Sequence, residues 1–189
     1  MLARDGRLGF VPRTNPVLLP VRSVLFAVLL PAVMTGWIPL VMFEHYPAWD
    51  DGYMAAHEWL AVALAAAGIV AYASCAWQFT RKGRGTVAPW DGPRKLVQRG
   101  LYRWVRNPMY ISLGAVVASE AIYFESWRIA LYLLCLACIA QLFVVLHEEP
   151  EMGFRYGAMY EDYKRAVPRW FPRRPRPTAF ELDPTSVER

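Results

Sequence analysis

Two short polar clusters beside apolar segments carry the residue types that could do chemistry. The first cluster, Gly100–Tyr110, combines two tyrosines, two arginines, an asparagine and a proline within eleven residues. The second cluster, His147–Glu151, holds three glutamates directly after the last long apolar run. Carboxylates, phenols and guanidinium groups can bind and orient a polar ligand, and a plain membrane anchor needs none of them. The question is whether the two clusters form one site.

Part of the first cluster has a purely structural explanation. Asn107 and Pro108 are typical of a helix start, because asparagine caps a helix and proline fits its first turn. Tyr102, Arg106 and Tyr110 are left over, and membrane-interface aromatics and positive-inside arginines explain them only generically. Spacing alone leaves a functional site and a plain helix start as equal alternatives.

The second cluster also has two explanations. Glu148 and Glu149 follow Ile139–Leu146 directly, where acids would oppose the dipole at the end of a membrane helix and lose solvation. Such a placement favours a positive partner, which could be Arg103, Arg106 or a ligand with an amino group. Alternatively, this cluster simply begins a cytoplasmic helix, in whose first turn acids are favourable.

The apolar runs predict a membrane protein. Apolar residues make up 56% of the 189-residue chain, and the runs 23–43 and 59–79 each contain no charge over 21 residues. About 20 apolar residues span a bilayer as a helix. The runs 109–124 and 129–146 flank residues 125–128 and predict a helical hairpin. We therefore expect an all-α, polytopic membrane helix bundle of about four transmembrane helices, with a fifth short membrane-associated helix as the alternative.

Finer features follow from composition. The Ala- and Gly-rich run 59–79 favours close helix packing, and a kink is expected near Pro31. A cytosolic helical segment is expected over Glu149–Arg165, with Pro168 ending it. The whole chain is interpreted as a single membrane domain with four parts: an N-terminal arm (1–16), a first helical pair (17–80), a core (81–172) and a flexible tail (173–189).

The distribution of the net charge of +5 predicts the orientation. Basic residues gather in the N-terminal arm and in the loop 81–108, whereas the loop 44–58 is acidic. Positively charged loops stay on the cytoplasmic side, so both termini and both polar clusters are expected there, in an inner or plasma membrane. The same pattern excludes nucleic acid as the partner, since the positive charges flank apolar segments.

No metal or redox site is predicted. The cysteines all lie inside apolar runs and are interpreted as small buried residues: Cys75, Cys135 and Cys138. His45 and His57 are interpreted as solvated loop residues. Glu120 stands alone in a short apolar run and is expected either near the far membrane interface or facing the helix bundle.

Several further motifs complete an ordered series. They are Leu96-Val97, Gly100-x-Tyr102, Arg106-Asn-Pro-x-Tyr110 and Gly114, followed by Glu148-Glu149, Tyr156-Gly157, Tyr160, Tyr163 and Val167-Pro168-Arg169. The series resembles the isoprenylcysteine carboxyl methyltransferase family of integral membrane enzymes and is similar to the wider group that contains phospholipid methyltransferases. The resemblance covers residues 81–172, about half of the chain.

The resemblance implies an enzyme that uses S-adenosyl-L-methionine without a Rossmann domain. The cofactor would enter from the cytosol and lie between the last two membrane helices and the C-terminal segment. By position, the cofactor site would be lined by Leu96, Val97, Tyr102, Asn107, Pro108, Met109, Tyr110, Glu148 and Glu149. Arg106 and Glu148 are expected to act in catalysis. Carboxylates suit the ammonium and ribose hydroxyls of the cofactor, aromatic rings suit its adenine and sulfonium, and Arg106 suits its carboxylate.

Two departures bear on the acceptor of the methyl group. Many family members have histidine where this chain has Asn107, and carboxylate-methylating members have arginine at the position of Val144. The second departure speaks against prenylcysteine carboxyl methylation. The predicted acceptor is a lipophilic small molecule or membrane lipid, with O-, N- and S-methylation all open, as is the oligomeric state. The alternatives are a phospholipid N-methyltransferase and, from another class, a non-enzymatic membrane subunit or small carrier that retains the fold.

Overall fold

The computed structural model describes residues 28–42, 54–78 and 96–175, and every regular element in these ranges is helical. In chain order the elements are η1 Val33–Trp37, α2 Ile38–Met42, α3 Ala56–Gln78, η3 Gly100–Arg103, α4 Pro108–Tyr123, α5 Trp127–Phe143, η4 Val144–Glu148, α6 Glu149–Tyr156 and α7 Ala158–Ala166. The all-α prediction is therefore confirmed. Several predictions fall on residues outside these ranges. They concern the N-terminal arm, His45, most of the loop 81–108, and most of the tail 173–189.

Two helices are long and apolar enough to cross a membrane. They are α3, with 23 residues, and the continuous helix Trp127–Tyr156, with 30 residues. Val28–Met42 is a shorter apolar helix, and α4 has 16 residues, which gives it a length of about 24 Å against about 30 Å of hydrocarbon. The predicted count of four transmembrane helices stays a prediction.

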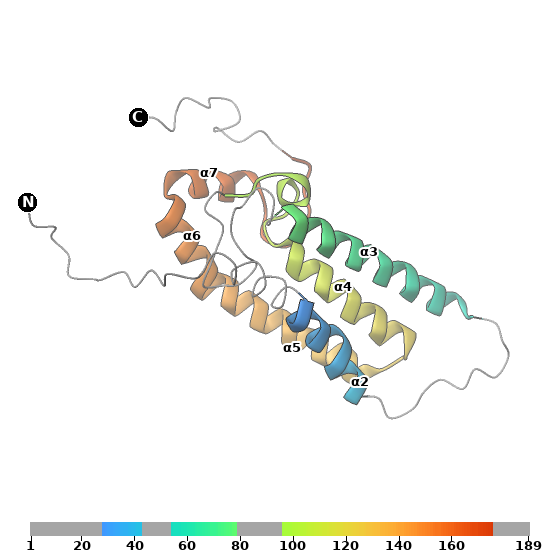
Figure 1. Ribbon diagram of the computed structural model, residues 1–189. Coiled ribbons are helices and arrows are strands. Elements are labelled where there is room, and N and C mark those ends of the chain that lie inside the picture. The colour runs from blue at the N-terminus through green and yellow to red at the C-terminus, as the bar shows by residue number, and fades with distance from the viewer. Residues whose placement is uncertain (1–27, 43–53, 79–95, 176–189) are drawn as a thin grey trace, which may run out of the picture.

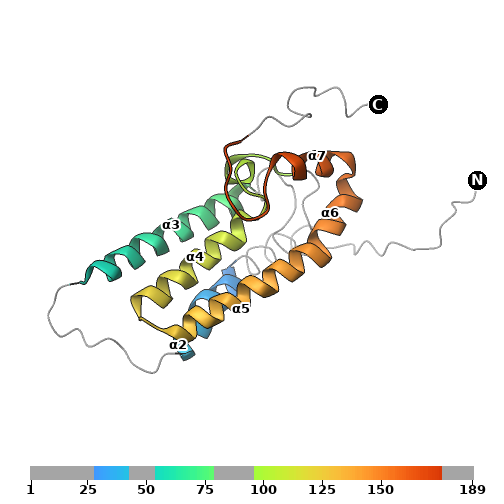
Figure 2. The ribbon, with the colours of Figure 1, turned by 180° about the vertical axis from the view of Figure 1, so that it is seen from behind.

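Helix α4 lies between α3 and α5 (Figures 1 and 2). Its contact with α3 is close because Gly68 has no side chain: a Cβ there would lie 2.8 Å from the Ser112 carbonyl oxygen and 2.9 Å from Val116 Cγ2. The Ser112 hydroxyl donates to the Pro108 carbonyl at 2.7 Å and so adds no polar group to this contact. The close packing predicted for the Ala- and Gly-rich run is confirmed.

The predicted hairpin between α4 and α5 is present, but α5 begins at Trp127, two residues before the predicted start at Ile129. The reason is Ser126, whose hydroxyl accepts a hydrogen bond from the Ile129 amide at 3.4 Å and caps the helix. An N-cap side chain satisfies one of the free amides of the first turn, so Trp127 and Arg128 join the helix.

The predicted helix 129–146 does not end at Leu146. The helix passes through the widened turn η4 and continues to Tyr156. Glu148 and Glu149 therefore lie inside a helix and do not face an unfavourable dipole at its C-terminal end. The helix predicted over Glu149–Arg165 is also broken, at Gly157, whose φ of 53° is a left-handed value that glycine adopts readily. The chain changes direction at Gly157, and helix α7, Ala158–Ala166, lies across the end of the bundle (Figure 1).

The irregular turn of the first helix lies after Pro31 and before Pro39. The widened turn η1 occupies Val33–Trp37, and its closing amide, Ile38, bonds the Val33 carbonyl. Pro39 has no amide for the Thr35 carbonyl and its ring would clash with that carbonyl, which explains a wider turn at this place.

Candidate functional site

The two polar clusters meet in the structure. Arg106, which follows η3, donates from Nη1 to Glu149 Oε1 at 2.9 Å. Each of the two side chains is only 11% exposed, so this ion pair is held in a partly dehydrated environment. Of the two arginines considered as partners of the glutamates, the structure selects Arg106, whereas Arg103 lies at the exposed surface.

A second arginine also binds Glu149. Arg169 donates from Nε to Glu149 Oε1 at 2.6 Å and from Nη2 to Oε2 at 2.9 Å. These hydrogen bonds to Glu149 raise the pKa of Arg169 above its ordinary value, so its guanidinium remains charged. Two guanidinium groups therefore face one carboxylate, and the cluster of three side chains carries one net positive charge.

Glu148 points to a different partner. The Tyr110 hydroxyl, on the first turn of α4, donates to Glu148 Oε1 at 2.6 Å. The Tyr110 ring meets the Trp170 ring edge to face, with 6.2 Å between centroids, and Trp170 Nε1 donates to Gln141 Oε1 at 2.6 Å. Because its hydrogen-bond partner is a neutral phenol, the charge of Glu148 is not balanced as that of Glu149 is.

A C-terminal strap, Pro168–Arg173, connects these contacts to the first cluster. The Arg106 amide donates to the Pro168 carbonyl at 2.9 Å, and the Arg173 amide donates to the Trp104 carbonyl at 3.0 Å. Asn107 is the residue before α4 as predicted, but its side chain does not cap the helix. Its Nδ2 instead donates to the Arg169 carbonyl at 3.3 Å, so the expected capping bond is replaced by a contact with the strap.

The remaining predicted residues pack beneath this cluster. Val97 and Tyr102 are buried with Cys75, and Met109 packs against them. Leu96 packs instead against a second buried group formed by Tyr160, Tyr163 and Val167, and Pro108 is buried at the start of α4. Within the described residues, no group of three or more His, Cys, Asp or Glu side chains could hold a metal ion.

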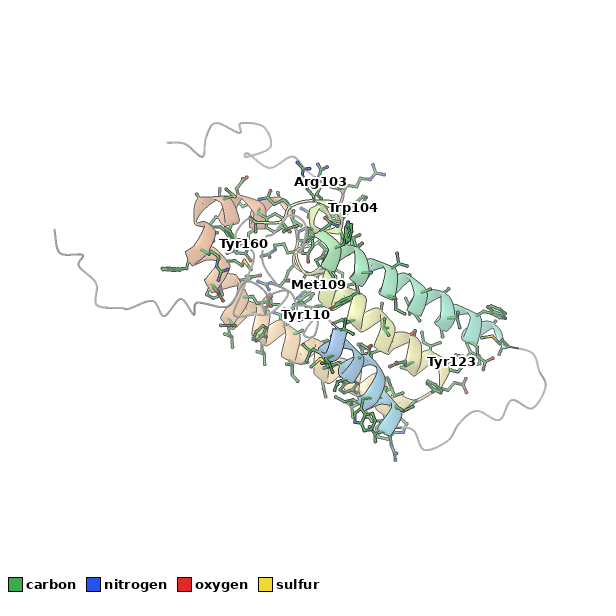
Figure 3. All side chains as sticks on the ribbon, viewed as in Figure 1. Arg103, Trp104, Met109, Tyr110, Tyr123 and Tyr160 are labelled. Atoms are coloured by element: carbon green, nitrogen blue, oxygen red, sulfur yellow. The ribbon has the colours of Figure 1, made fainter. Side chains whose placement is uncertain are left out.

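One hydrogen bond joins the two packed groups. The Tyr163 hydroxyl donates to the Tyr102 carbonyl at 2.7 Å, which ties α7 to η3. Burial raises the pKa of the Tyr102 phenol well above its ordinary value, so this side chain stays neutral. Figure 3 shows Met109 and Tyr110 at the end of α4 nearest to Tyr160 of α7, with Tyr123 at the opposite end.

Sequence reasoning assigned no role to Arg169, Trp170 or Gln141. Arg169 belongs to the Val167-Pro168-Arg169 motif of the ordered series, but the sequence predicts no contact for its side chain. Gln141 carries the one amide side chain in the apolar run 129–146, and an amide in apolar surroundings requires a partner. That requirement was the available signal for a polar contact on this face of α5.

Comparison with known proteins gives the class. A family model described as phospholipid methyltransferase matches residues 56–159, more than half of the chain. The match includes α3, α4, α5 and both polar clusters, and together with the two long apolar helices it indicates a membrane methyltransferase. The chain belongs to the phospholipid methyltransferase family, which confirms the predicted resemblance to this wider group. Neither the curated proteins nor the solved structures that were searched gave a match.

Proposed function

We propose that this protein transfers a methyl group from S-adenosyl-L-methionine to a lipophilic acceptor in the membrane. The observation that carries the proposal is the pairing of the two polar clusters: Tyr110 bonds Glu148 and Arg106 bonds Glu149, 38 and 43 residues apart in the chain. Both pairs lie within the residues matched by the methyltransferase family. The site is proposed to open to the cytoplasm.

The side chains present suit the proposed cofactor. Glu148, bonded to a neutral phenol, can accept hydrogen bonds from an ammonium or from ribose hydroxyls. The rings of Tyr110 and Trp170 suit adenine and a sulfonium cation. The net positive charge of Arg106, Arg169 and Glu149 suits a carboxylate. When bound, S-adenosyl-L-methionine supplies a methyl group on a positively charged sulfur.

The predicted cofactor residues keep two kinds of role in this proposal. Tyr110, Glu148 and Glu149 would hold polar groups of the ligand, directly or through the arginines. The others would shape and support the site by packing: Leu96, Val97, Tyr102, Asn107, Pro108 and Met109. Methyl transfer is an in-line displacement, so the protein chiefly has to position the acceptor and exclude water. Glu148 and Arg106 would act in this way, by orientation, and no residue has to serve as a general base for an unprotonated acceptor.

A phospholipid N-methyltransferase is the second candidate, and Val144 favours it over a carboxylate-methylating enzyme. Val144 is 1% exposed and apolar, where carboxylate-methylating relatives would have an arginine. Arg106 and Arg169 are both bonded to Glu149 instead. An amine acceptor needs no additional arginine.

The test is transfer of isotopic label from S-adenosyl-L-methionine into a membrane extract incubated with the purified protein. Label in a lipid fraction supports the proposal, and label in phospholipid head groups selects the second candidate. Cofactor binding without any transfer would instead favour the non-enzymatic membrane subunit or carrier. A Glu148→Gln variant, which should bind the cofactor more weakly, serves as the control with reduced transfer.

A further inference from the structure

Glu148 and Glu149 are consecutive, yet both make contacts on the bundle side of their helix. The widened turn η4, Val144–Glu148, lies just before Glu149, whose amide bonds the Val144 carbonyl five residues back instead of four. Such a turn adds one residue to the helix without adding a turn. It therefore changes which face every later residue occupies.

Pro150 accounts for the position of this turn. A regular helix would bring the proline ring against the Leu146 carbonyl, and proline has no amide to bond that carbonyl. The same relation occurs in the first helix, where η1 ends at Trp37 and Pro39 follows two residues later, as Pro150 follows Glu148. The two widened turns thus share one local cause.

The effect on Glu149 follows from helix geometry. Successive residues of a regular helix are rotated by about 100°, so Glu149 would lie only about 20° from Leu142, seven residues earlier. Leu142 is 59% exposed on the outer surface of the bundle. Because η4 contains one extra residue in its turn, Glu149 lies instead about 120° from Leu142 around the helix axis. This angle directs Glu149 toward the bundle.

The exposed side chains on the outer face of the helix agree with a shift of one residue at η4. Leu142 and Phe154 are 59% and 95% exposed, although they are twelve residues apart and would be rotated by about 120° on a regular helix. The extra residue in the turn η4 reduces the angle between Leu142 and Phe154 to about 20°, so both side chains face outward. The inward face agrees, because Gln141 and Glu149 are bonded by adjacent residues of the strap, Trp170 and Arg169.

We propose that η4 is a register shift that turns Glu149 toward Arg106 and Arg169 while Glu148 stays on the bundle side, bonded to Tyr110, and that the site depends on this shift. The residues of η4 before Glu148 are then positioning residues. The binding test of this inference rests on the proposed function, whereas the geometric test below does not.

A matched pair of variants in a Pro150→Ala background tests the inference. Deleting Val145 there allows a regular helix that leaves both glutamates on their present faces, so the Kd for S-adenosyl-L-methionine should stay within about threefold of wild type. Inserting one alanine between Leu146 and His147 should rotate Glu149 outward and raise the Kd by at least about tenfold. A folded deletion variant that does not bind, or an insertion variant that binds like wild type, overturns the inference.

The geometric test needs no change in chain length and no cofactor. Single nitroxide labels are placed at Leu142, Val144, Met152 or Phe154 of a chain whose native cysteines are replaced by alanine. The register shift predicts mobile labels at Leu142 and Phe154 and immobilised labels at Val144 and Met152. An immobilised label at Phe154 together with a mobile one at Met152 would contradict it, even if the protein binds no S-adenosyl-L-methionine.

Discussion

Arg169 and Glu149 form a two-point contact, with Nε to Oε1 at 2.6 Å and Nη2 to Oε2 at 2.9 Å. Guanidinium and carboxylate planes match in this arrangement, which fixes orientation as well as charge. The contact joins the C-terminal strap to the long helix Trp127–Tyr156, and Arg106 joins the same carboxylate to the first polar cluster. Glu149 is therefore the point at which three separate segments of the chain meet.

Replacing Glu149 by glutamine should destabilise the protein. Arg106, 11% exposed, would lose its countercharge, and an unpaired buried charge costs about 3–5 kcal/mol, less where water reaches the group. We expect a loss of roughly 2–3 kcal/mol for Glu149→Gln and a smaller loss for Arg169→Gln, which leaves Arg106 paired. Thermal unfolding in one fixed detergent measures both. Equal Tm values for Glu149→Gln and wild type would contradict a structural role of the ion pairs.

Removing only the Tyr110 hydroxyl should affect binding more than stability. Tyr110→Phe keeps the ring against Trp170 but leaves Glu148 without its hydrogen bond, worth about 1–1.5 kcal/mol and hence about tenfold in Kd. Tyr123→Phe, at the far end of α4, is the matched control and should bind S-adenosyl-L-methionine like wild type. Isothermal titration compares the three proteins. Similar losses in both variants would show that the effect is not local to Glu148.

The Trp170–Gln141 hydrogen bond should be detectable as a coupling energy. Trp170→Phe leaves the Gln141 amide unpaired in an apolar helix, at a cost of about 1–3 kcal/mol. Gln141→Leu removes the amide that needs a partner. Trp170→Phe should therefore lower the free energy of unfolding less in a Gln141→Leu protein than in wild type. A double-mutant cycle on the free energy of unfolding measures the difference. If the two single changes in the free energy of unfolding are strictly additive in the double variant, the 2.6 Å hydrogen bond contributes no coupling energy.

The α3–α4 contact gives a prediction with an internal control. Gly68→Ala places a Cβ 2.8 Å from the Ser112 carbonyl oxygen, whereas at Gly114 the nearest atom to an added Cβ lies at an ordinary 3.7 Å. Overpacking a close helix contact costs about 1–3 kcal/mol, so Gly68→Ala should lower Tm and Gly114→Ala should not. The reverse order of Tm values would contradict the described packing of α3 against α4.

Much of the fold could be predicted because it depends on local signals. Charge-free runs gave the apolar helices, and Glu125–Arg128 marked the hairpin. The extension of the last helix to Tyr156 could not be predicted in the same way. His147–Glu151 has the composition of a helix boundary, and the arginines that neutralise Glu149 lie 43 and 20 residues away in the chain.

The candidate site was predicted in part for the same reason. Arg106, Tyr110 and the two glutamates belong to the two polar clusters, so residue type and spacing drew attention to them. The contribution of the strap depends on how α7 turns at Gly157 and brings Trp170 beside Tyr110, which is a tertiary relationship. The inward direction of Glu149 depends on η4, and hydropathy periodicity assumes a regular helix that does not include such a turn.

The most direct measurement of the central claim is a titration of the purified protein with S-adenosyl-L-methionine. Wild type and Glu161→Gln, a change at an exposed ion pair with Lys164 on α7, should bind with similar Kd. Glu148→Gln should bind at least about tenfold more weakly, because the neutral amide oxygen accepts weaker hydrogen bonds than the carboxylate does. Absence of binding to wild type, or an unchanged Kd in Glu148→Gln, would contradict the account.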